Sequence, residues 1–187
     1  MVFAFSTSSA IASVAVFDAE GRILFAEEKA ANMQASSACF EMLDRAGFDP
    51  KLGALFLADI GPGSFTGTRV GVAIAKTLAY VAKAQCAGAT SFDLVASDLT
   101  VVLPSKKNEW FVREPGQEPY RTTSLPEHDF VGFGKGIDHE TFPLAARFAA
   151  LLPHLKRTSP EEFVPTYLIE PSISVQKKGL GLAGGTA

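Results

Sequence analysis

The alternation of apolar and polar positions at the start of the chain predicts three short strands. Residues 2–6, 12–18 and 22–28 are apolar runs, separated by the polar stretches "STSS" and "DAEG". Short apolar runs bounded by such turn residues are typical of an antiparallel meander. We therefore expect three consecutive paired strands in this part of the chain.

Helical and strand patterns alternate after these strands. In residues 35–47 the apolar side chains recur at i, i+3, i+4 and i+7, which places them on one face of a helix that Gly47 can end. Residues 54–60 form a continuous apolar run, as expected for a strand covered on both faces. Residues 68–84 predict a second helix. Its expected core side consists of Val70, Ile74, Leu78 and Val81.

A further strand at "CAGAT" and a helix from Ser91 to Ala96 complete the order βββαβαβα. This order describes a ribonuclease H-like lobe of the α/β class, a mixed sheet with helices on its faces. Beyond it we expect a smaller lobe with strands at 101–103 and 110–113, a glycine turn at "FVGFGKG" and a helix at 142–152. The predicted domains are residues 1–98 and residues 99–187, the latter ending in a flexible glycine-rich tail.

Composition adds limits on the class of protein. Of the 187 residues 47% are hydrophobic and 20% charged, and the net charge is −3. No Lys/Arg cluster is longer than a pair, so an extended nucleic-acid footprint is not expected on this chain alone. No uncharged apolar run approaches the ~18 residues of a membrane span. These features, with Cys39 and Cys86 as reduced thiols, predict a cytoplasmic protein without membrane contact.

The stretch "GPGSFTGTRVG" (residues 61–71) is the strongest candidate for chemistry. It lacks the lysine of a phosphate-binding P-loop, and Ser64 lacks the flanking glycines of a nucleophile elbow. Two interpretations remain open. The backbone N–H groups beside a helix N-terminus suit an anion. The glycines equally suit a turn that brings helix and sheet into close contact.

The same stretch, extended to "GPGSFTGTRVGVAIAKTLA", resembles the signature segment of the TsaB (YeaZ) family, a bacterial paralogue of TsaD. "FAFSTSSAIASVAVFDAEGRI", "GATSFDLVA", "FVGFGKG" and "VPTYLIEP" are similar to other segments of that family. The resemblance implies an actin-like (sugar-kinase-like ATPase) fold built from two ribonuclease H-like lobes. It also implies a role in making threonylcarbamoyladenosine next to the anticodon of tRNA.

The chain departs from the family pattern at positions that matter for catalysis. Ser6-Thr7-Ser8 stands where the family usually has Asp-Thr-Ser, so the carboxylate that could organise a hydrated Mg²⁺ is missing. TsaD binds its metal through a His-x-x-x-His pair, and the first helical region here has no histidine. Phe133 and Ile169 replace a common acidic residue and the usual arginine. The resemblance thus implies a pseudo-enzyme with no catalytic residue and no metal.

The role implied by the resemblance is a scaffold. It would bind TsaD through the first two helices, with the small ATPase TsaE joining them and tRNA reached only through the complex. Met33 and Phe40 point away from the buried stripe, where they could be an interface anchor or be covered by the next helix, and the resemblance favours the interface. Arg69, Lys76 and Tyr80 share a face of the second helix, for which a solvated charged face is the alternative.

Nucleotide binding is also expected. The candidate contacts are Thr7, Gly63, Ser64 and Gly67, and ATP or ADP would lie at an interface shared with the partner. The alternative functions are an independent nucleotide-binding, ATP-hydrolysing enzyme of the actin-like superfamily and, as a third, a peptidase using Ser64. The sequence leaves open whether the chain forms a homodimer when alone.

Overall fold

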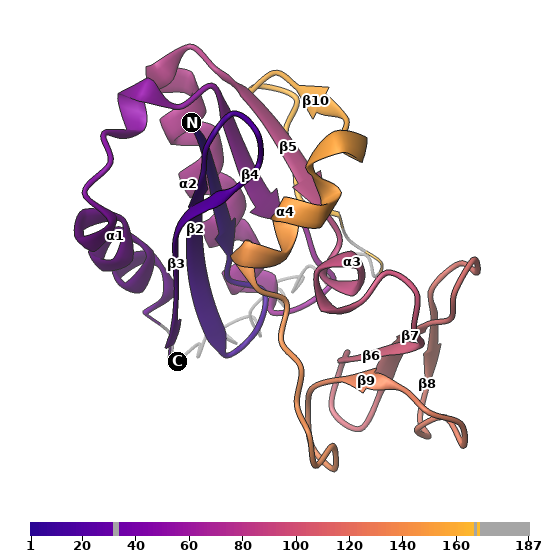
Figure 1. The fold of residues 1–187 in the computed structure, drawn as a ribbon. Helices are drawn as coiled ribbons and strands as arrows, with labels where there is room; N and C mark the ends of the chain where they lie inside the picture. Colours follow the sequence, from indigo (N-terminus) through magenta and orange to yellow (C-terminus); the bar gives the residue numbers. More distant parts are fainter. Residues whose placement is uncertain (32–33, 167, 169–187) are drawn as a thin grey trace, which may run out of the picture.

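The computed structural model describes residues 1–31, 34–166 and 168, and it contains two sheets (Figure 1). The larger one is a mixed sheet in the order β10-β5-β4-β1-β2-β3. Its strands are β1 (Val2–Ser6), β2 (Ile11–Phe17), β3 (Ile23–Ala30), β4 (Leu55–Asp59), β5 (Gln85–Ala89) and β10 (Arg157–Thr158). Strand β1 pairs antiparallel with β2 and parallel with β4, so the predicted meander continues into a parallel half.

The order β1, β2, β3, α1, β4, α2, β5, α3 confirms the predicted order of elements and the ribonuclease H-like, actin-like fold. Helices α1 (Ala35–Ala46) and α2 (Phe65–Ala82) cover one face of the sheet. Their apolar residues pack with alternate residues of β1 and β2, such as Phe3, Phe5 and Val14. The intervening residues of these strands, such as Ala4 and Ala15, face a second apolar layer on the other side.

The core side of α2 differs from the prediction. Val81, expected in the core, is 57% exposed, whereas Gly71, Ala75 and Ala79 are buried. Small residues face the sheet because they let the helix axis approach the strands closely. The helix also begins three residues earlier than expected, since the Ser64 side chain accepts a hydrogen bond from the N–H of Gly67 and caps it there.

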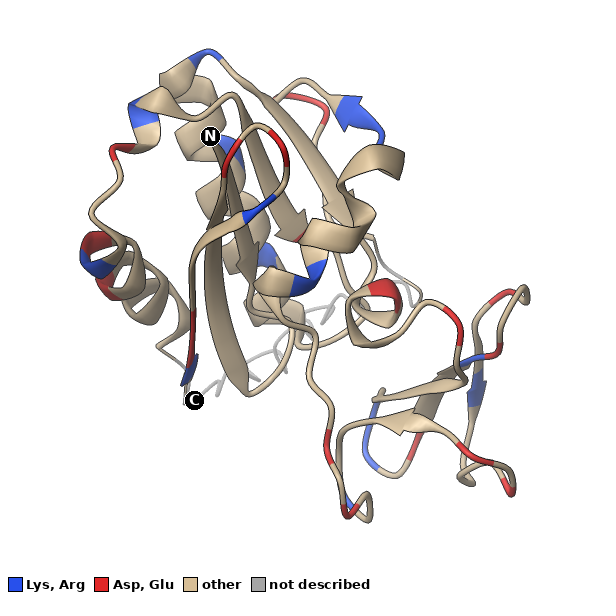
Figure 2. Ribbon diagram, in the orientation of Figure 1, with Lys and Arg blue, Asp and Glu red and all other residues tan. Residues whose placement is uncertain are grey.

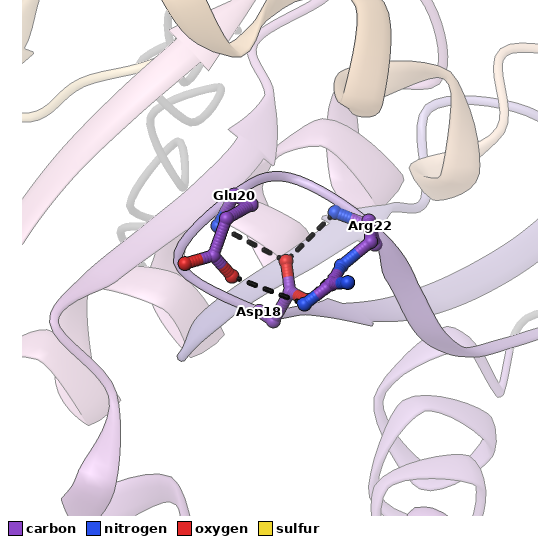
Figure 3. A network of polar contacts seen from close by, with 3 residues as sticks. All are labelled: Asp18, Glu20 and Arg22. Atoms are coloured by element: carbon purple, nitrogen blue, oxygen red, sulfur yellow. Dashed lines mark hydrogen bonds and ion pairs between the residues drawn. The ribbon is translucent and has the colours of Figure 1, made fainter.

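The turn between β2 and β3 is organised by one carboxylate (Figure 3). Asp18 Oδ1 accepts hydrogen bonds from the backbone N–H groups of Glu20 (3.0 Å) and Arg22 (2.9 Å). Asp18 Oδ2 accepts a third from Nε of Arg22 at 2.6 Å. An aspartate that binds backbone groups two or more residues ahead fixes a tight turn. The polar stretch "DAEG" therefore acts as the predicted turn.

The second sheet is small, and the chain returns from it to the first. Its order is β8 (Tyr120–Thr122), β7 (Trp110–Arg113), β6 (Val101–Pro104) and β9 (Val131–Gly132), packed beside α3 (Ser91–Val95). The helix expected at 142–152 is broken into η2 (Ala145–Arg147), α4 (Phe148–Leu151) and η3 (Leu152–His154). Ala145 and Phe148 pack on the first sheet, and β10 pairs with β5. Residues 143–158, which the division at residue 99 assigned to the second lobe, thus contact the first.

No helix among the described residues is long and apolar enough to cross a membrane. The predicted glycine-rich tail and Ile169 lie outside the described residues.

Candidate functional site at the carboxyl ends of the parallel strands

The glycine loop follows β4 and leads into α2, at the edge of the sheet where β1 and β4 also end. In open α/β sheets this edge is where ligands bind. The loop lies against the segment that follows β1. Ser64 N–H donates to the carbonyl of Ser8 at 2.7 Å, and Thr7 Oγ1 donates to the carbonyl of Gly67 at the same distance. The structure therefore brings together all four residues predicted to contact a nucleotide, which are Thr7, Gly63, Ser64 and Gly67.

The glycines of the loop lie directly against the backbone of the segment that follows β1. A Cβ atom placed on Gly63 would overlap the carbonyl of Ser8, and one on Gly67 would overlap the carbonyl of Thr7. A Cβ on Gly71 would lie 2.6 Å from Thr7 Oγ1. The side of each Cα that would carry a side chain thus faces neighbouring protein atoms. This supports the interpretation that the glycines allow helix and sheet to come into close contact. Ser64 uses its hydroxyl oxygen as the cap of α2.

A buried carboxyl group that the sequence analysis missed lies beneath this loop. Asp59 ends β4 and is 1% exposed. Its Oδ2 contacts Oγ of Ser6 at 2.9 Å and of Ser8 at 2.5 Å. Its Oδ1 contacts Oγ of Ser91 at 2.6 Å and accepts from the N–H of Gly61 at 2.9 Å. The signal was present in the sequence, because Asp59 is the one charged residue in the run 54–60 that we treated as continuously apolar.

Burial raises the pKa of Asp59 above its ordinary value. The hydrogen bonds from Ser8, Ser91, Gly61 and Ser6 act in the opposite direction, since they stabilise a carboxylate. Desolvation is the larger effect on a group with no exposed surface. The neutral form is therefore favoured over a wider pH range than in an exposed aspartate.

This donor set does not fit a metal ion. Both oxygens of Asp59 are already in contact with hydroxyl or N–H groups, and a hard cation would need several further oxygen ligands. Within the part of the chain that the structure describes, no group of three or more His, Cys, Asp and Glu residues could hold a metal. Both cysteines are buried, and burial raises the pKa of Cys39 to about 12 and that of Cys86 to about 11, so neither is an activated thiolate.

The residues predicted to bind a partner lie on the outer side of α1 and α2. Phe40 on α1 is 50% exposed and Tyr80 on α2 is 70% exposed. The Arg69 guanidinium stacks over the ring of Phe65, 4.0 Å from its centre. Lys76 differs from the expectation, because its Nζ donates to the carbonyls of Glu161 (3.3 Å) and Phe163 (3.1 Å) and so holds a later segment of the chain. Met33 lies outside the described residues.

Comparison with known proteins shows what this chain is similar to. Residues 28–107 match the family model of TsaD, tRNA N6-adenosine threonylcarbamoyltransferase. A solved structure described as an uncharacterized protein with similarity to peptidase YEAZ from Pseudomonas aeruginosa has a TM-score of 0.73 at 17% identity. The match covers 90% of this chain and 99% of that one. No curated protein matches the sequence.

A second structure, YeaZ from Pseudomonas aeruginosa, matches with a TM-score of 0.68 and 17% identity over 89% of this chain and 99% of its own. The structures share the fold with this chain, and the family model covers its segment from β3 to β6. The family model thus shows that residues 28–107 are similar to TsaD, and the two solved structures show that the chain shares the fold of YeaZ.

Two departures from the TsaB pattern now have a structural explanation. Ser6 replaces the family's usual aspartate, and its hydroxyl lies 2.9 Å from a carboxyl oxygen of Asp59 on the neighbouring strand. A carboxyl group is therefore present beside position 6, contrary to the expectation that this region lacks one, but it is buried and bound by hydroxyls. Phe133 is 5% exposed and packs on Phe142 with 5.0 Å between ring centres, so it belongs to the core of the second lobe.

Proposed function

We propose that this chain is a non-catalytic scaffold subunit that binds TsaD and supports transfer of the threonylcarbamoyl group to adenosine next to the anticodon of tRNA. In this proposal the partner supplies the metal and the chemistry. TsaE joins the pair, and tRNA is reached only through the complex. Any ATP or ADP would lie at an interface shared with the partner.

The observation that carries the proposal is the packing of the glycine loop. Gly63 and Gly67 lie directly against the backbone of Ser8 and Thr7, so close contact within the chain accounts for these glycines without a bound phosphate. Asp59 below it is buried and surrounded by donors. Such an arrangement supports a scaffold better than an enzyme that binds a nucleotide and a cation by itself.

The charge distribution gives a second argument. Figure 2 shows Lys and Arg residues interspersed with Asp and Glu along the ribbon of the described residues. On α1, for example, Arg45 and Glu41 form ion pairs with Glu27 and Lys29 of β3. Proteins that hold RNA directly present clustered positive charge. This favours contact with tRNA through a partner.

The outer side of α1 and α2 is the proposed interface. Half of the Phe40 surface is exposed, and Phe65, Tyr80 and Val81 are 46%, 70% and 57% exposed. Exposed aromatic residues near an apolar helix surface are typical anchors of protein interfaces. The same side would be used in a homodimer if the chain forms one when alone.

The test is size-exclusion chromatography with light scattering, on the chain alone and mixed with TsaD, with and without ATP. We expect a heterodimer with TsaD and a modification activity in vitro that requires both chains. Absence of a complex at micromolar concentrations would contradict the scaffold role. ATP turnover by the isolated chain with Mg²⁺ would instead support an independent nucleotide enzyme, and peptide hydrolysis lost in Ser64→Ala would support a peptidase.

Phe40→Glu tests the interface itself. A charge at an anchor position that becomes buried on binding costs several kcal/mol, so we expect binding to TsaD to fall by a factor of about 100 or more. The matched control is Leu99→Glu, since Leu99 has a similar exposure of 48% but follows α3, away from the proposed interface. Circular dichroism and the unfolding midpoint should be unchanged in both variants. Unfolding of Phe40→Glu, or equal loss of binding in both, would contradict the assignment.

A further inference from the structure

The contacts around Asp59 form a small closed network. Besides the four contacts of its carboxyl group, Oγ of Ser91 lies 3.0 Å from Oγ of Ser8, and Oγ of Ser6 lies 2.7 Å from the carbonyl oxygen of Pro143. The network therefore has six contacts at hydrogen-bond distance. It joins the end of β1, the end of β4, the glycine loop, α3 and the segment that returns from the second lobe.

Counting protons shows that an ionised Asp59 leaves this network incomplete. The available donors would be the hydroxyl protons of Ser6, Ser8 and Ser91 and the N–H of Gly61. Each hydroxyl donates only one hydrogen bond. Four protons serve six contacts, so the Ser8–Ser91 contact and one of the two contacts of Ser6 would have none.

A proton on Asp59 Oδ2 supplies a fifth donor to the network. It can be donated to Ser8 Oγ across the 2.5 Å contact, which frees Ser8 to donate to Ser91 and Ser91 to donate to Asp59 Oδ1. Ser6 is then free to donate to the carbonyl of Pro143. The carboxyl group and two serines close a ring of hydrogen bonds, and five protons serve five of the six contacts. The 2.9 Å contact between Ser6 Oγ and Asp59 Oδ2 is the one without a proton.

We propose that Asp59 is a neutral carboxylic acid in the folded protein and that its proton completes a latch joining the strand ends to the segment returning from the second lobe. The latch has two bonds to the returning segment. Ser6 Oγ donates to the carbonyl of Pro143, and the backbone N–H of Ala145 donates to Ser13 Oγ at 2.8 Å. The groups facing Asp59 from β1, the glycine loop and α3 are hydroxyls and an amide, none of which titrates near neutral pH. The latch would therefore weaken when Asp59 ionises at higher pH. This inference stands whether or not the chain binds TsaD.

The pH dependence of unfolding tests the proposal. Because the folded state retains a proton that the unfolded chain releases, stability is greatest below the ordinary aspartate pKa and falls as pH rises toward the pKa of the folded state. Asp59→Asn keeps the shape, donates through its amide and cannot ionise. We expect the unfolding constant of the wild type, divided by that of Asp59→Asn, to rise with pH above the ordinary aspartate pKa, by up to about tenfold per pH unit until the pKa of the folded state is reached.

Asp44→Asn is the matched control, because Asp44 is an exposed carboxyl on α1, and it should keep the slope of the wild type. If Asp59→Asn does not fold, the ¹³C chemical shift of the Asp59 carboxyl carbon in the wild type gives the answer, with the value of a protonated acid expected at pH 7. A ratio that does not change with pH, or a carboxylate shift at neutral pH, would overturn the proposal.

Discussion

At the scale of single residues, the glycines of the loop are set by contact with backbone rather than by a ligand. The sequence alone permitted both interpretations, because a glycine beside a helix N-terminus suits either. The decisive fact is that the Cα of Gly67 lies against the carbonyl of Thr7. That contact joins residues separated by 60 positions, so no local pattern contains it.

Gly67→Ala tests this conclusion. We expect a loss of about 2 kcal/mol in the free energy of unfolding, since overpacking a tight contact typically costs 1–3 kcal/mol and outweighs the helix propensity of alanine. Denaturant unfolding measures it. The control Thr66→Ala, at the exposed preceding position of α2, should change stability by no more than about 0.5 kcal/mol. A stable Gly67→Ala protein would revive the ligand-binding interpretation.

At the scale of elements, periodicity located the strands and helices but not always their buried faces. The order from β1 to α3 agrees with the prediction because each of these segments has a clear apolar period. The core side of α2 was wrong at Val81, because the helix buries glycine and alanine against the sheet. The last expected helix was too long, because Pro153 lies within η3 and only a few residues around Phe148 are in the apolar layer.

The capping of α3 gives a prediction at this scale. The Thr90 side chain accepts from the N–H of Asp93, and the Asp93 carboxylate accepts from the N–H of Thr90, which is a capping box. Thr90→Ala should lower the free energy of unfolding by about 1 kcal/mol, as measured by denaturant titration. Thr77→Ala, on the exposed side of α2, is the control and should not destabilise. Equal effects of the two changes would contradict a role for the cap.

At the scale of the whole molecule, the two sheets are held together by few polar contacts. Arg113 of β7 bonds to Asp93 of α3 at 2.9 Å and to the carbonyl of Ala96, and only 13% of its side chain is exposed. The second link is the returning segment, which Ser6 and Ser13 bind at Pro143 and Ala145. One arginine and two serines that are far apart in the sequence therefore contribute to the position of the small lobe, beside the contacts of α3 with both sheets.

Arg113→Met tests the first of these links. It removes the partner of Asp93 Oδ1 and of the Ala96 carbonyl, while Asp93 Oδ2 keeps its contacts with Thr90, and the loss should cost about 1–3 kcal/mol. Hydrogen exchange should locate the loss in β6 and β7. Arg121→Met is the control, because the Arg121–Glu109 pair is largely exposed and contributes little. If the hydrogen-exchange rates of β6 and β7 are the same in Arg113→Met and Arg121→Met, Arg113 does not hold the second sheet in place.

The sequence by itself determined the order of elements, the turn chemistry and the family resemblance, because these depend on residues close together along the chain. It also predicted the outward position of Phe40, because helical spacing alone places this side chain away from the buried stripe. Tertiary structure decided the rest. It placed the backbone of Thr7 and Ser8 against the glycines of the loop. It also placed Lys76 Nζ where it donates to backbone carbonyls. It also placed three serines around Asp59, Ser6 at the end of β1, Ser8 just after it and Ser91 from α3. Each of these depends on atoms that meet only when the strands are side by side, so no periodicity or composition could predict them.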